Sequence, residues 1–309
     1  MIVPGVTFFK NTRQRQMRIN EIKFLILSMR PGQWIKNILI FAAIIFSRNL
    51  LYGTMLLKTI GAFFLFCCYS GSVYIMNDLI DIKSDQIHPI KRHRPLASGK
   101  LTKSTAVLGL GAIVLFSLSV GWLLGRAFFI VCLSYLLLQV AYSLIVKKIV
   151  ILDVFSIAFG FVLRVIAGAE LIHVPISSWL LICTMLLSLF LALSKRRQEL
   201  VFLDEKATKH RMILQEYSPH LLDQMIAVVT SATVIAYALY TIAPETVQKF
   251  QTTQLIYTVP FILYGIFRYL YLIHRKNEGG SPEKVLITDK PLLINILIYA
   301  IVVILILYR

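Results

Sequence analysis

Long apolar runs alternate with short polar connections over most of the chain. An apolar run of about 20 residues can cross the hydrocarbon core of a bilayer as an α-helix. No segment has the two-residue alternation that is typical of a membrane β-strand. The pattern therefore predicts an all-α, polytopic membrane protein with nine transmembrane helices. The predicted spans are 34–52, 55–76, 104–124, 127–146, 149–172, 177–194, 225–243, 255–273 and 291–308.

The composition supports this class of protein. The chain is 58% hydrophobic and 15% charged, with a mean hydropathy of +0.76, whereas soluble domains are about 45–50% apolar and about 25% charged. We expect a basic N-terminal segment at 1–23 and one transmembrane domain at 24–309. The N-terminal segment lacks the apolar region and cleavage site of a signal peptide. The four cysteines lie in apolar spans without metal-ligand spacing, so we expect them to pack or to face lipid.

The distribution of basic residues predicts the topology. Most of the 32 Lys and Arg residues fall in the N-terminal segment and in alternate connections, including 77–103, 195–224 and 274–290. Cytoplasmic loops carry such an excess, so we expect a plasma-membrane protein with a cytoplasmic N-terminus and an external C-terminus. The net charge of +17 then reflects topology and attraction to anionic lipid rather than a nucleic-acid partner. The longer, more polar inner loops place the expected functional site at the cytoplasmic face.

The stretch "NDLIDIKSD" at the end of the second predicted span is rich in acids. On a helix, Asn77, Asp81 and Asp85 share one face, and Asp78 falls within the same quarter turn. Crowded carboxylates repel unless a cation lies between them. Mg²⁺ prefers oxygen ligands and shares one or two carboxylates with substrate phosphates. The pattern therefore predicts a catalytic Mg²⁺ on Asn77, Asp81 and Asp85, with Asp78 as a further candidate.

A basic loop follows these acids in the stretch "HPIKRHRPLASGK". Pro89 and Pro95 break helices and stiffen the loop that carries Lys91 and Arg94. An Arg side chain fits phosphate oxygens as a fork, and Lys supplies a point charge. A magnesium site beside this loop indicates a diphosphate donor held by Lys91 and Arg94. The alternative is a solvated helix end, in which Lys83 and Lys91 neutralise the acids.

The pattern NDxxDxxxD followed by a basic loop resembles the UbiA-type intramembrane prenyltransferase superfamily. The resemblance implies a nine-helix UbiA-like bundle with a cytoplasm-facing cavity and a diphosphate donor activated by Mg²⁺. Further stretches are similar to the branch that includes decaprenyl-phosphate phosphoribosyltransferase, and together they cover most of the chain from about residue 28 onward. They include "RPGQWIKN", "AYSLIVKKIVILDVFSIAFGFVLRVIAGA", "SLFLALSKRRQEL", "YGIFRYLYLIHR", "EYSPHLLDQM" and "SPEKVLITDKPLL".

The sequence departs from typical prenyl-diphosphate enzymes at "SKRRQEL". Those enzymes carry a second Asp-rich motif near the end of the sixth helix, whereas this chain has Lys195 and Arg196 there. Phosphoribosyl pyrophosphate (PRPP) carries a 5-phosphate besides its diphosphate, which a prenyl diphosphate lacks. We therefore expect Lys195 and Arg196 to bind the 5-phosphate. Lys195 could instead pair with Glu199, four residues later on the same helix face.

Other candidate residues follow from the resemblance. It implies that Lys36 binds the donor and that Tyr142 and Lys147 bind the phosphate of the acceptor. The alternative for Lys36 is a lysine that snorkels to the interface, and the alternative for Lys147 is topological charge.

The fifth predicted span carries one polar face. Asp153, Ser156, Gly160 and Arg164 recur at helical spacing. An arginine inside a span is costly and faces a partner or a water-filled cavity, so we expect Arg164 to line the donor site or to pair with an acid. Asp153 could orient a ribose hydroxyl or the cation, or pair with the lysines that end the preceding span.

These observations predict a polyprenyl-phosphate phosphoribosyltransferase. The expected reaction transfers 5-phosphoribose from PRPP to a polyprenyl phosphate in the membrane. The resemblance implies that the product is a lipid-linked pentose precursor for cell-envelope glycan. One alternative is a prenyltransferase that acts on an aromatic or glycerol-type acceptor. Another is a transporter or lipid-binding protein without chemistry, although the sequence has no inverted repeat or pair of broken helices. The sequence does not specify an oligomeric state.

Overall fold

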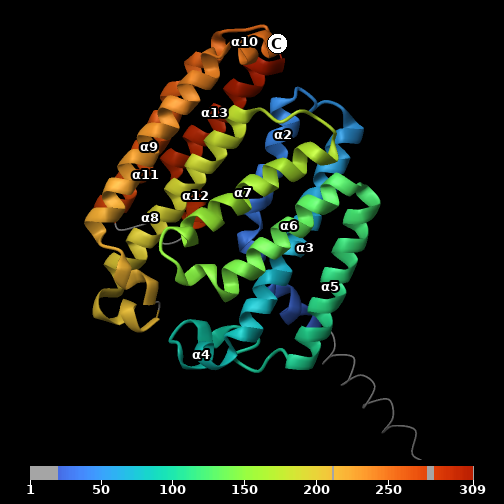
Figure 1. Cartoon of the computed structure of the whole chain (residues 1–309), viewed down its shortest axis with the longest axis vertical. Helices are drawn as coiled ribbons and strands as arrows, with labels where there is room; N and C mark the ends of the chain where they lie inside the picture. Colours follow the sequence, from blue (N-terminus) through green and yellow to red (C-terminus); the bar gives the residue numbers. More distant parts are fainter. Residues whose placement is uncertain (1–19, 211, 277–281, 309) are drawn as a thin grey trace, which may run out of the picture. The chain divides into compact units, whose positions relative to one another are not determined.

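The computed structural model describes residues 20–210, 212–276 and 282–308, and these residues form helices joined by short connections (Figure 1). Eight helices among them are long and apolar enough to cross a membrane. This confirms the predicted all-α membrane class. The eight are α3 (Gly53–Ile80), α5 (Lys103–Leu124), α6 (Arg126–Leu144), α7 (Leu152–Leu171), α8 (Ser178–His210), α9 (Pro219–Ile242), α11 (Val259–Arg275, preceded by the 3₁₀ helix η5, Gln254–Thr258) and α13 (Lys290–Tyr308).

The predicted first span differs from the observed one. Instead of a helix over 34–52, the chain forms the 3₁₀ helix η1 (Pro31–Ile40) followed by α2 (Phe41–Phe46). This apolar segment is shorter than the other eight. A 3₁₀ helix rises about 2.0 Å per residue and an α-helix about 1.5 Å, so the two parts together reach about 29 Å. That length nearly equals the ~30 Å hydrocarbon core.

The helices group into two compact units. One takes in the described parts of Met1–Asn37 and Phe63–Leu136, and the other comprises Ile38–Ala62 and the described parts of Leu137–Arg309. The predicted boundary after residue 23 falls inside a helical stretch at 20–28, while 1–19 lie outside the described residues. That boundary stays a prediction. The remaining short helices are α4 (Ile82–Ile87), η2 (Lys91–His93), η3 (Val146–Lys148), η4 (Met212–Glu216), α10 (Pro244–Phe250) and α12 (Pro282–Thr288).

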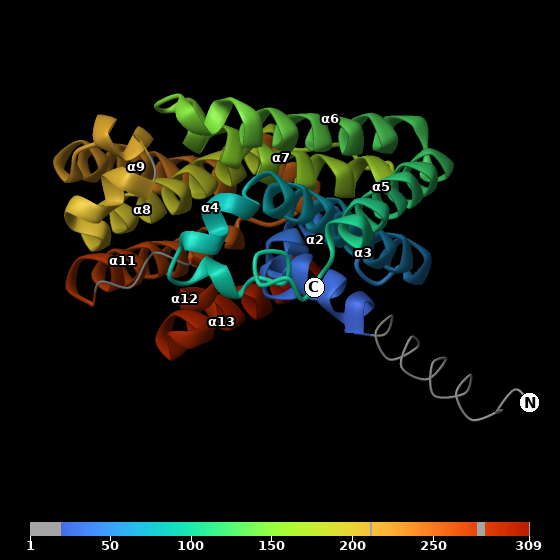
Figure 2. The ribbon, with the colours of Figure 1, turned by 90° about the horizontal axis from the view of Figure 1, so that it is seen from below.

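Within the second unit, α8 lies between α7 and α9 and packs against both (Figures 1 and 2). Their apolar side chains, with those of α11, form a core that includes Val154, Leu193, Leu222 and Leu272. This core fixes the ends of α7, α8 and α9 relative to one another, which matters because polar side chains gather there.

Local sequence explains where several helices begin and end. Thr102 caps α5 by accepting the Thr105 amide at 3.2 Å, and Ser218 caps α9 by accepting the Leu221 amide at 3.1 Å. Gly125, with φ +142°, forms the single-residue turn between α5 and α6. Only glycine adopts such a conformation readily.

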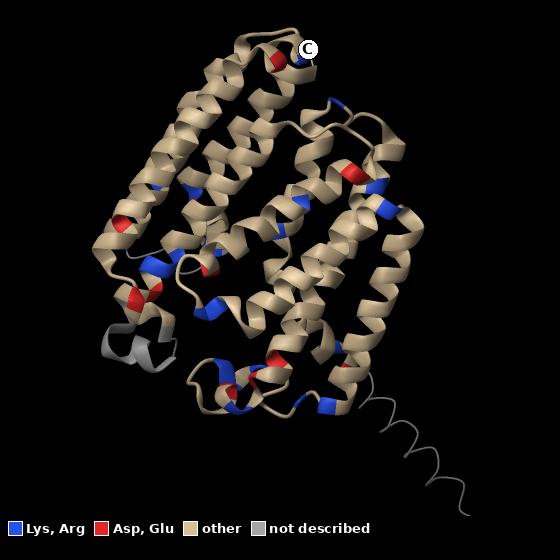
Figure 3. Ribbon diagram, in the orientation of Figure 1, with Lys and Arg blue, Asp and Glu red and all other residues tan. Residues whose placement is uncertain are grey.

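The charge distribution fits a membrane environment. Lys, Arg, Asp and Glu gather on α4 and the loops, whereas the long helices are mostly free of charge along their lengths (Figure 3). Large apolar side chains such as Leu57, Leu108, Leu123 and Leu305 are exposed. Surfaces of this kind match lipid rather than water, since large exposed apolar patches are rare on soluble monomers.

Gly168 on α7 is the point where this helix contacts the end of η1. A Cβ atom added there would lie 2.2 Å from the Ile40 carbonyl oxygen. We therefore predict that Gly168→Ala lowers the free energy of unfolding by about 1–3 kcal/mol, because backbone must move to relieve the overlap. Thermal unfolding of the detergent-purified protein measures this. Gly111→Ala, a helical position with open space around it, should cost nothing, and an equal loss in both variants would contradict the prediction.

Candidate functional site

The acidic residues of "NDLIDIKSD" lie where α3 ends and α4 begins. Asp81 separates the two helices, yet its amide donates to the Asn77 carbonyl at 2.9 Å and its carbonyl accepts the Asp85 amide at 2.8 Å. These i to i+4 bonds keep Asn77, Asp81 and Asp85 in one row along the helix surface. The helical register that underlies the magnesium prediction is therefore present across the junction.

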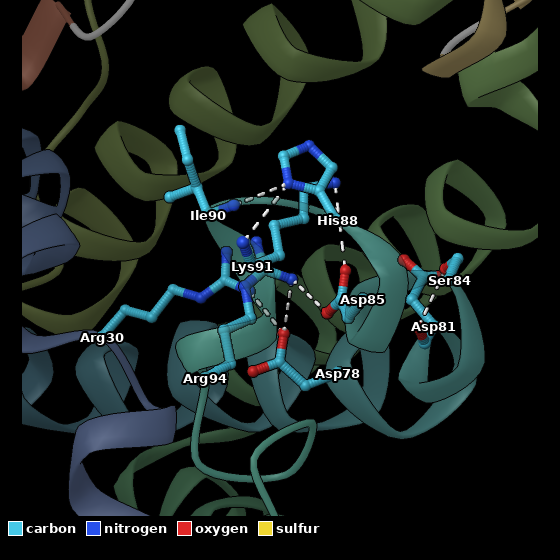
Figure 4. Close-up of polar contacts among 9 residues, drawn as sticks. All are labelled: Arg30, Asp78, Asp81, Ser84, Asp85, His88, Ile90, Lys91 and Arg94. Carbon is cyan, nitrogen blue, oxygen red and sulfur yellow. Dashed lines mark hydrogen bonds and ion pairs between the residues drawn. The ribbon is translucent and has the colours of Figure 1, made fainter.

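Asp78 and Asp85 are both buried and share one cation, as Figure 4 shows. Arg94 Nη1 lies 3.1 Å from Asp78 Oδ1 and 2.7 Å from Asp85 Oδ2. Lys91 Nζ lies 4.0 Å from Asp85 Oδ1, and the His88 ring accepts the Lys91 amide at 3.3 Å, which shapes this loop. Both bases that the sequence predicts for the donor thus lie beside the acids.

Arg30 joins the same group, a role that was not predicted from the sequence. Its Nη2 donates to Asp78 Oδ1 at 2.5 Å, and its guanidinium lies 4.6 Å from the centre of the Tyr74 ring. The residue has φ +53° directly before Pro31. A basic residue at the start of a span, followed by a helix-starting proline, was the available signal. We call Arg30, Asp78, Asp85, Lys91 and Arg94 the Asp78–Asp85 cluster.

The acidic row offers few ligands for a magnesium ion. No three His, Cys, Asp or Glu side chains among the described residues converge as metal ligands, and Asp81 lies beside Ser84, apart from Asp78 (Figure 4). Asn77 and Asp81 are only partly buried. Mg²⁺ needs just one or two carboxylates and completes its shell with water and substrate phosphate. The two carboxylates and one amide oxygen of the Asn77–Asp81–Asp85 row are thus, in type and number, donors that suit Mg²⁺.

A second polar group, in the other unit, surrounds Arg196 of α8. Its Nε donates to Asp153 Oδ2 at 2.7 Å, its Nη1 to Glu199 Oε2 at 2.6 Å, and its Nη2 to the Tyr142 hydroxyl at 3.3 Å. Arg196 is 1% exposed and Asp153 is fully buried. Arg196 is thus held by protein groups here, and Glu199, the predicted alternative partner of Lys195, pairs with Arg196.

Tyr217 completes this group from the segment that follows η4. Its hydroxyl donates to Asp153 Oδ1 at 2.8 Å and accepts the Ile151 amide at 2.7 Å. Burial raises the pKa of Tyr217 to about 12, so the hydroxyl keeps the proton that it donates. We call Tyr142, Asp153, Arg196, Glu199 and Tyr217 the Asp153 network. Sequence patterns did not indicate Tyr217, because its partners lie far away along the chain.

The other predicted donor residues have local contacts. Lys36 on η1 donates to Gln33 Oε1 at 2.5 Å. Arg164 is buried on the predicted polar face of α7, donates to the Gly160 carbonyl at 2.7 Å and lies over the Phe161 ring. Lys195 on α8 is partly buried. Their donor-binding roles stay predictions.

Lys147, the predicted acceptor ligand, lies in η3 just before α7 and is partly buried. Arg268 on α11, a second arginine within a membrane-spanning helix, forms a two-pronged ion pair with Asp289 at 3.0 and 2.8 Å. These hydrogen bonds hold the pKa of the Asp289 carboxyl below its usual value. Arg268 is thus paired with an acid, as expected for a charge inside a span.

One cavity of about 340 Å³ lies in the second unit. Its lining combines apolar side chains with a few polar ones and contains no residue of the predicted site. The lining includes Phe46, Leu180, Tyr240, Glu245 and Lys249.

Comparison with known proteins supports the resemblance seen in the sequence. The model of the UbiA prenyltransferase family matches residues 38–289. A decaprenyl-phosphate phosphoribosyltransferase of Mycolicibacterium smegmatis is 31% identical over 284 residues, which cover 88% of this chain and 89% of that protein. A protein of the same name from Corynebacterium glutamicum is 29% identical over 300 residues, covering 94% of this chain and 88% of the relative.

The fold is shared with solved membrane proteins. A UbiA homolog from Archaeoglobus fulgidus bound to GPP and Mg²⁺ superimposes with a TM-score of 0.69 at 20% identity, covering 93% of this chain and 100% of that one. The same homolog bound to DMAPP and Mg²⁺ gives a TM-score of 0.70 at 19% identity, covering 93% and 99%.

Proposed function

This chain belongs to the UbiA prenyltransferase family, and from that premise we propose that it transfers 5-phosphoribose from PRPP to a polyprenyl phosphate and releases pyrophosphate. The relatives that cover most of its length carry the name decaprenyl-phosphate phosphoribosyltransferase. The donor enters from the cytoplasm and the acceptor keeps its tail in the bilayer. The product is a lipid-linked pentose phosphate, a precursor for cell-envelope glycan.

The observation that carries the proposal is the Asp78–Asp85 cluster. Three cations converge there on two buried carboxylates, one at the end of the transmembrane helix α3 and one on α4. Arg30, Lys91 and Arg94 remain partly exposed, with side-chain exposures of 31%, 44% and 26%. They can therefore bind the diphosphate while Asp78 and Asp85 keep the guanidinium forks in place. Charge-assisted, two-pronged contacts of Arg with phosphate are strong and directional.

The reaction forms one bond and breaks one. The bond between ribose C1 and the pyrophosphate oxygen breaks, and its electron pair leaves with pyrophosphate. A phosphate oxygen of the acceptor then forms the new bond to C1 from the opposite face. The acceptor phosphate is already an anion, so the chain needs no general base. Catalysis by this chain consists of positioning and electrostatic stabilisation of the leaving group.

Asn77, Asp81 and Asp85 would hold a magnesium ion, which when bound neutralises charge on the departing pyrophosphate. The solved family members bound to Mg²⁺ support this cofactor. Asp78 has a different role in this proposal. Since Arg30 and Arg94 both contact it, it orients these side chains for the diphosphate.

The 5-phosphate and the acceptor phosphate need further cations. We assign Lys195 to the 5-phosphate and Lys147 to the acceptor phosphate, because both are basic and only partly buried. We also assign Lys36 and Arg164 to binding of the donor. Arg196 supports the site indirectly, as part of the Asp153 network, since its guanidinium already has three protein partners.

A transfer assay tests the function. Purified protein with radiolabelled PRPP, polyprenyl phosphate and Mg²⁺ should yield labelled lipid and pyrophosphate, and chelation of Mg²⁺ with EDTA should abolish the product. The matched arm replaces PRPP by labelled prenyl diphosphate and supplies aromatic or glycerol-type acceptors. Transfer in that arm with none from PRPP would identify a prenyltransferase and contradict the proposal.

A further inference from the structure

The backbone directly before α7 has an uncommon conformation. Ile151 has φ +68° and ψ −47°, and the Leu152 amide donates to the Val150 carbonyl at 2.7 Å. A hydrogen bond between residues two apart around a central residue of this conformation defines a rare, strained type of γ-turn. A β-branched residue makes it more costly still, because its Cβ crowds the backbone at positive φ. Strained turns persist only where surrounding contacts hold them, and they concentrate at functional sites.

Tyr217 supplies the contact that holds this turn. Its hydroxyl accepts the amide of the strained residue itself and donates to Asp153, two residues later. Tyr217 is 4% exposed, and its neighbours Ile213 and Leu214 are buried in the core. The hydroxyl is therefore carried by a packed segment rather than by a loose loop.

The turn lies between two groups that matter for the proposed reaction. On its N-terminal side is η3 with Lys147, and on its C-terminal side is Asp153, whose other oxygen accepts the Arg196 Nε at 2.7 Å. Both groups are within four residues of Ile151 along the chain. A change at the turn therefore shifts Lys147 with respect to the Asp153 network. Misplacement of a binding group by about 1 Å can cost about a hundredfold in rate.

We infer that Tyr217 is a positioning residue that holds the strained turn at Ile151 and thereby fixes Lys147 for the acceptor phosphate. The inference rests on the proposed function for its catalytic consequence. Tyr217 belongs neither to the acidic motif nor to the basic residues that we propose bind phosphate. Tyr217 contacts no substrate in this scheme, and it acts through the backbone of the loop before α7.

The experiment compares Tyr217→Phe with Tyr308→Phe in the full-length protein. Tyr308 is matched, because its hydroxyl also accepts a backbone amide, that of Leu50 at 2.9 Å. We expect Tyr217→Phe to raise the KM for polyprenyl phosphate roughly tenfold, consistent with the loss of a hydrogen bond to a charged group. The kcat and the KM for PRPP should change by less than about threefold, since Arg196 keeps its contacts to Glu199 and Tyr142. Tyr308→Phe should leave all three constants unchanged.

A rescue variant separates positioning from a general loss of packing. Glycine adopts positive φ without steric cost, and Ile151 is 44% exposed, so replacing it opens no hole in the core. Ile151→Gly added to Tyr217→Phe should bring the KM for polyprenyl phosphate back toward that of the native protein. A failure of this rescue would overturn the inference, as would an equal KM change in Tyr308→Phe.

Hydrogen–deuterium exchange gives a readout that needs no activity. Amides of the segment 146–153 should exchange faster in Tyr217→Phe than in the native protein, and Tyr308→Phe should not change them. If the native protein transfers no ribose phosphate, the proposed function is wrong. The exchange comparison then tests by itself whether Tyr217 holds the turn at Ile151. Unchanged exchange in Tyr217→Phe would overturn the inference.

Discussion

Asp85→Asn should reduce the transfer of ribose phosphate by about a thousandfold. In our proposal, this one change replaces a charged magnesium ligand by a neutral amide and also removes the negative charge that holds Arg94 at 2.7 Å. Loss of a single group that stabilises developing charge costs about 10²–10³ in kcat, and Asp85 serves two such groups. Initial rates with radiolabelled PRPP, saturating polyprenyl phosphate and a series of Mg²⁺ concentrations measure the loss.

The Mg²⁺ series distinguishes the two roles of Asp85. If the variant recovers at high Mg²⁺, the main loss is metal affinity, whereas a loss that Mg²⁺ cannot reverse reflects the released Arg94. Glu245→Gln is the control, because it removes one exposed carboxylate from α10 without touching the cluster. A variant Asp85→Asn that retains the native rate at every Mg²⁺ concentration would exclude the proposed site.

Arg196→Met should destabilise the protein by about 3–5 kcal/mol. Removing one partner of a buried ion pair leaves an unpaired buried charge, and here Asp153 is fully buried. Thermal unfolding in detergent measures the change. Because the two residues act as a unit, Arg196→Met combined with Asp153→Asn should cost less than the sum of the single changes.

Two neighbouring residues on α8 serve as controls. Arg197 pairs with Asp223, whose side chain is 37% exposed, so Arg197→Met should cost only about 1 kcal/mol or less. Lys195→Ala should leave stability unchanged and raise the KM for PRPP, since we assign it to the 5-phosphate. If Lys195→Ala left that KM unchanged, the assignment would be wrong. If Arg196→Met lost no more stability than Arg197→Met, the Asp153 network would not be the internal support that we describe.

Most of the fold was predictable because long apolar runs are a strong signal for transmembrane helices. Hydrophobicity alone located eight spans, and predicted 291–308, for example, matches α13 at Lys290–Tyr308. The prediction was less accurate for 34–52. A 3₁₀ segment and an α-helix have the same hydropathy, so the composition of η1 could not reveal its tighter winding or its earlier start.

The candidate site was predictable only where it depends on local spacing. The row of Asn77, Asp81 and Asp85 follows from helical periodicity and is present in the structure. The partners of each charge do not follow from periodicity. A basic side chain can bind phosphate or pair with a buried acid. The stretch "SKRRQEL" therefore could not show which of Lys195 and Arg196 is buried against Asp153. Arg30 and Tyr217 were missed for the same reason, since their contacts join distant parts of the chain.

The short first apolar segment has a consequence for the surrounding bilayer. At about 29 Å, η1 and α2 together have almost no spare length for tilting across a ~30 Å core. Longer helices accommodate thicker membranes by changing their tilt, whereas this segment cannot. Hydrophobic mismatch would therefore fall on the stretch from Pro31 to Phe46, and the bilayer would have to thin locally beside it. Arg30, at the start of this stretch, contacts Asp78, so if the segment crosses the bilayer, we expect lipid acyl-chain length to affect the geometry of the Asp78–Asp85 cluster.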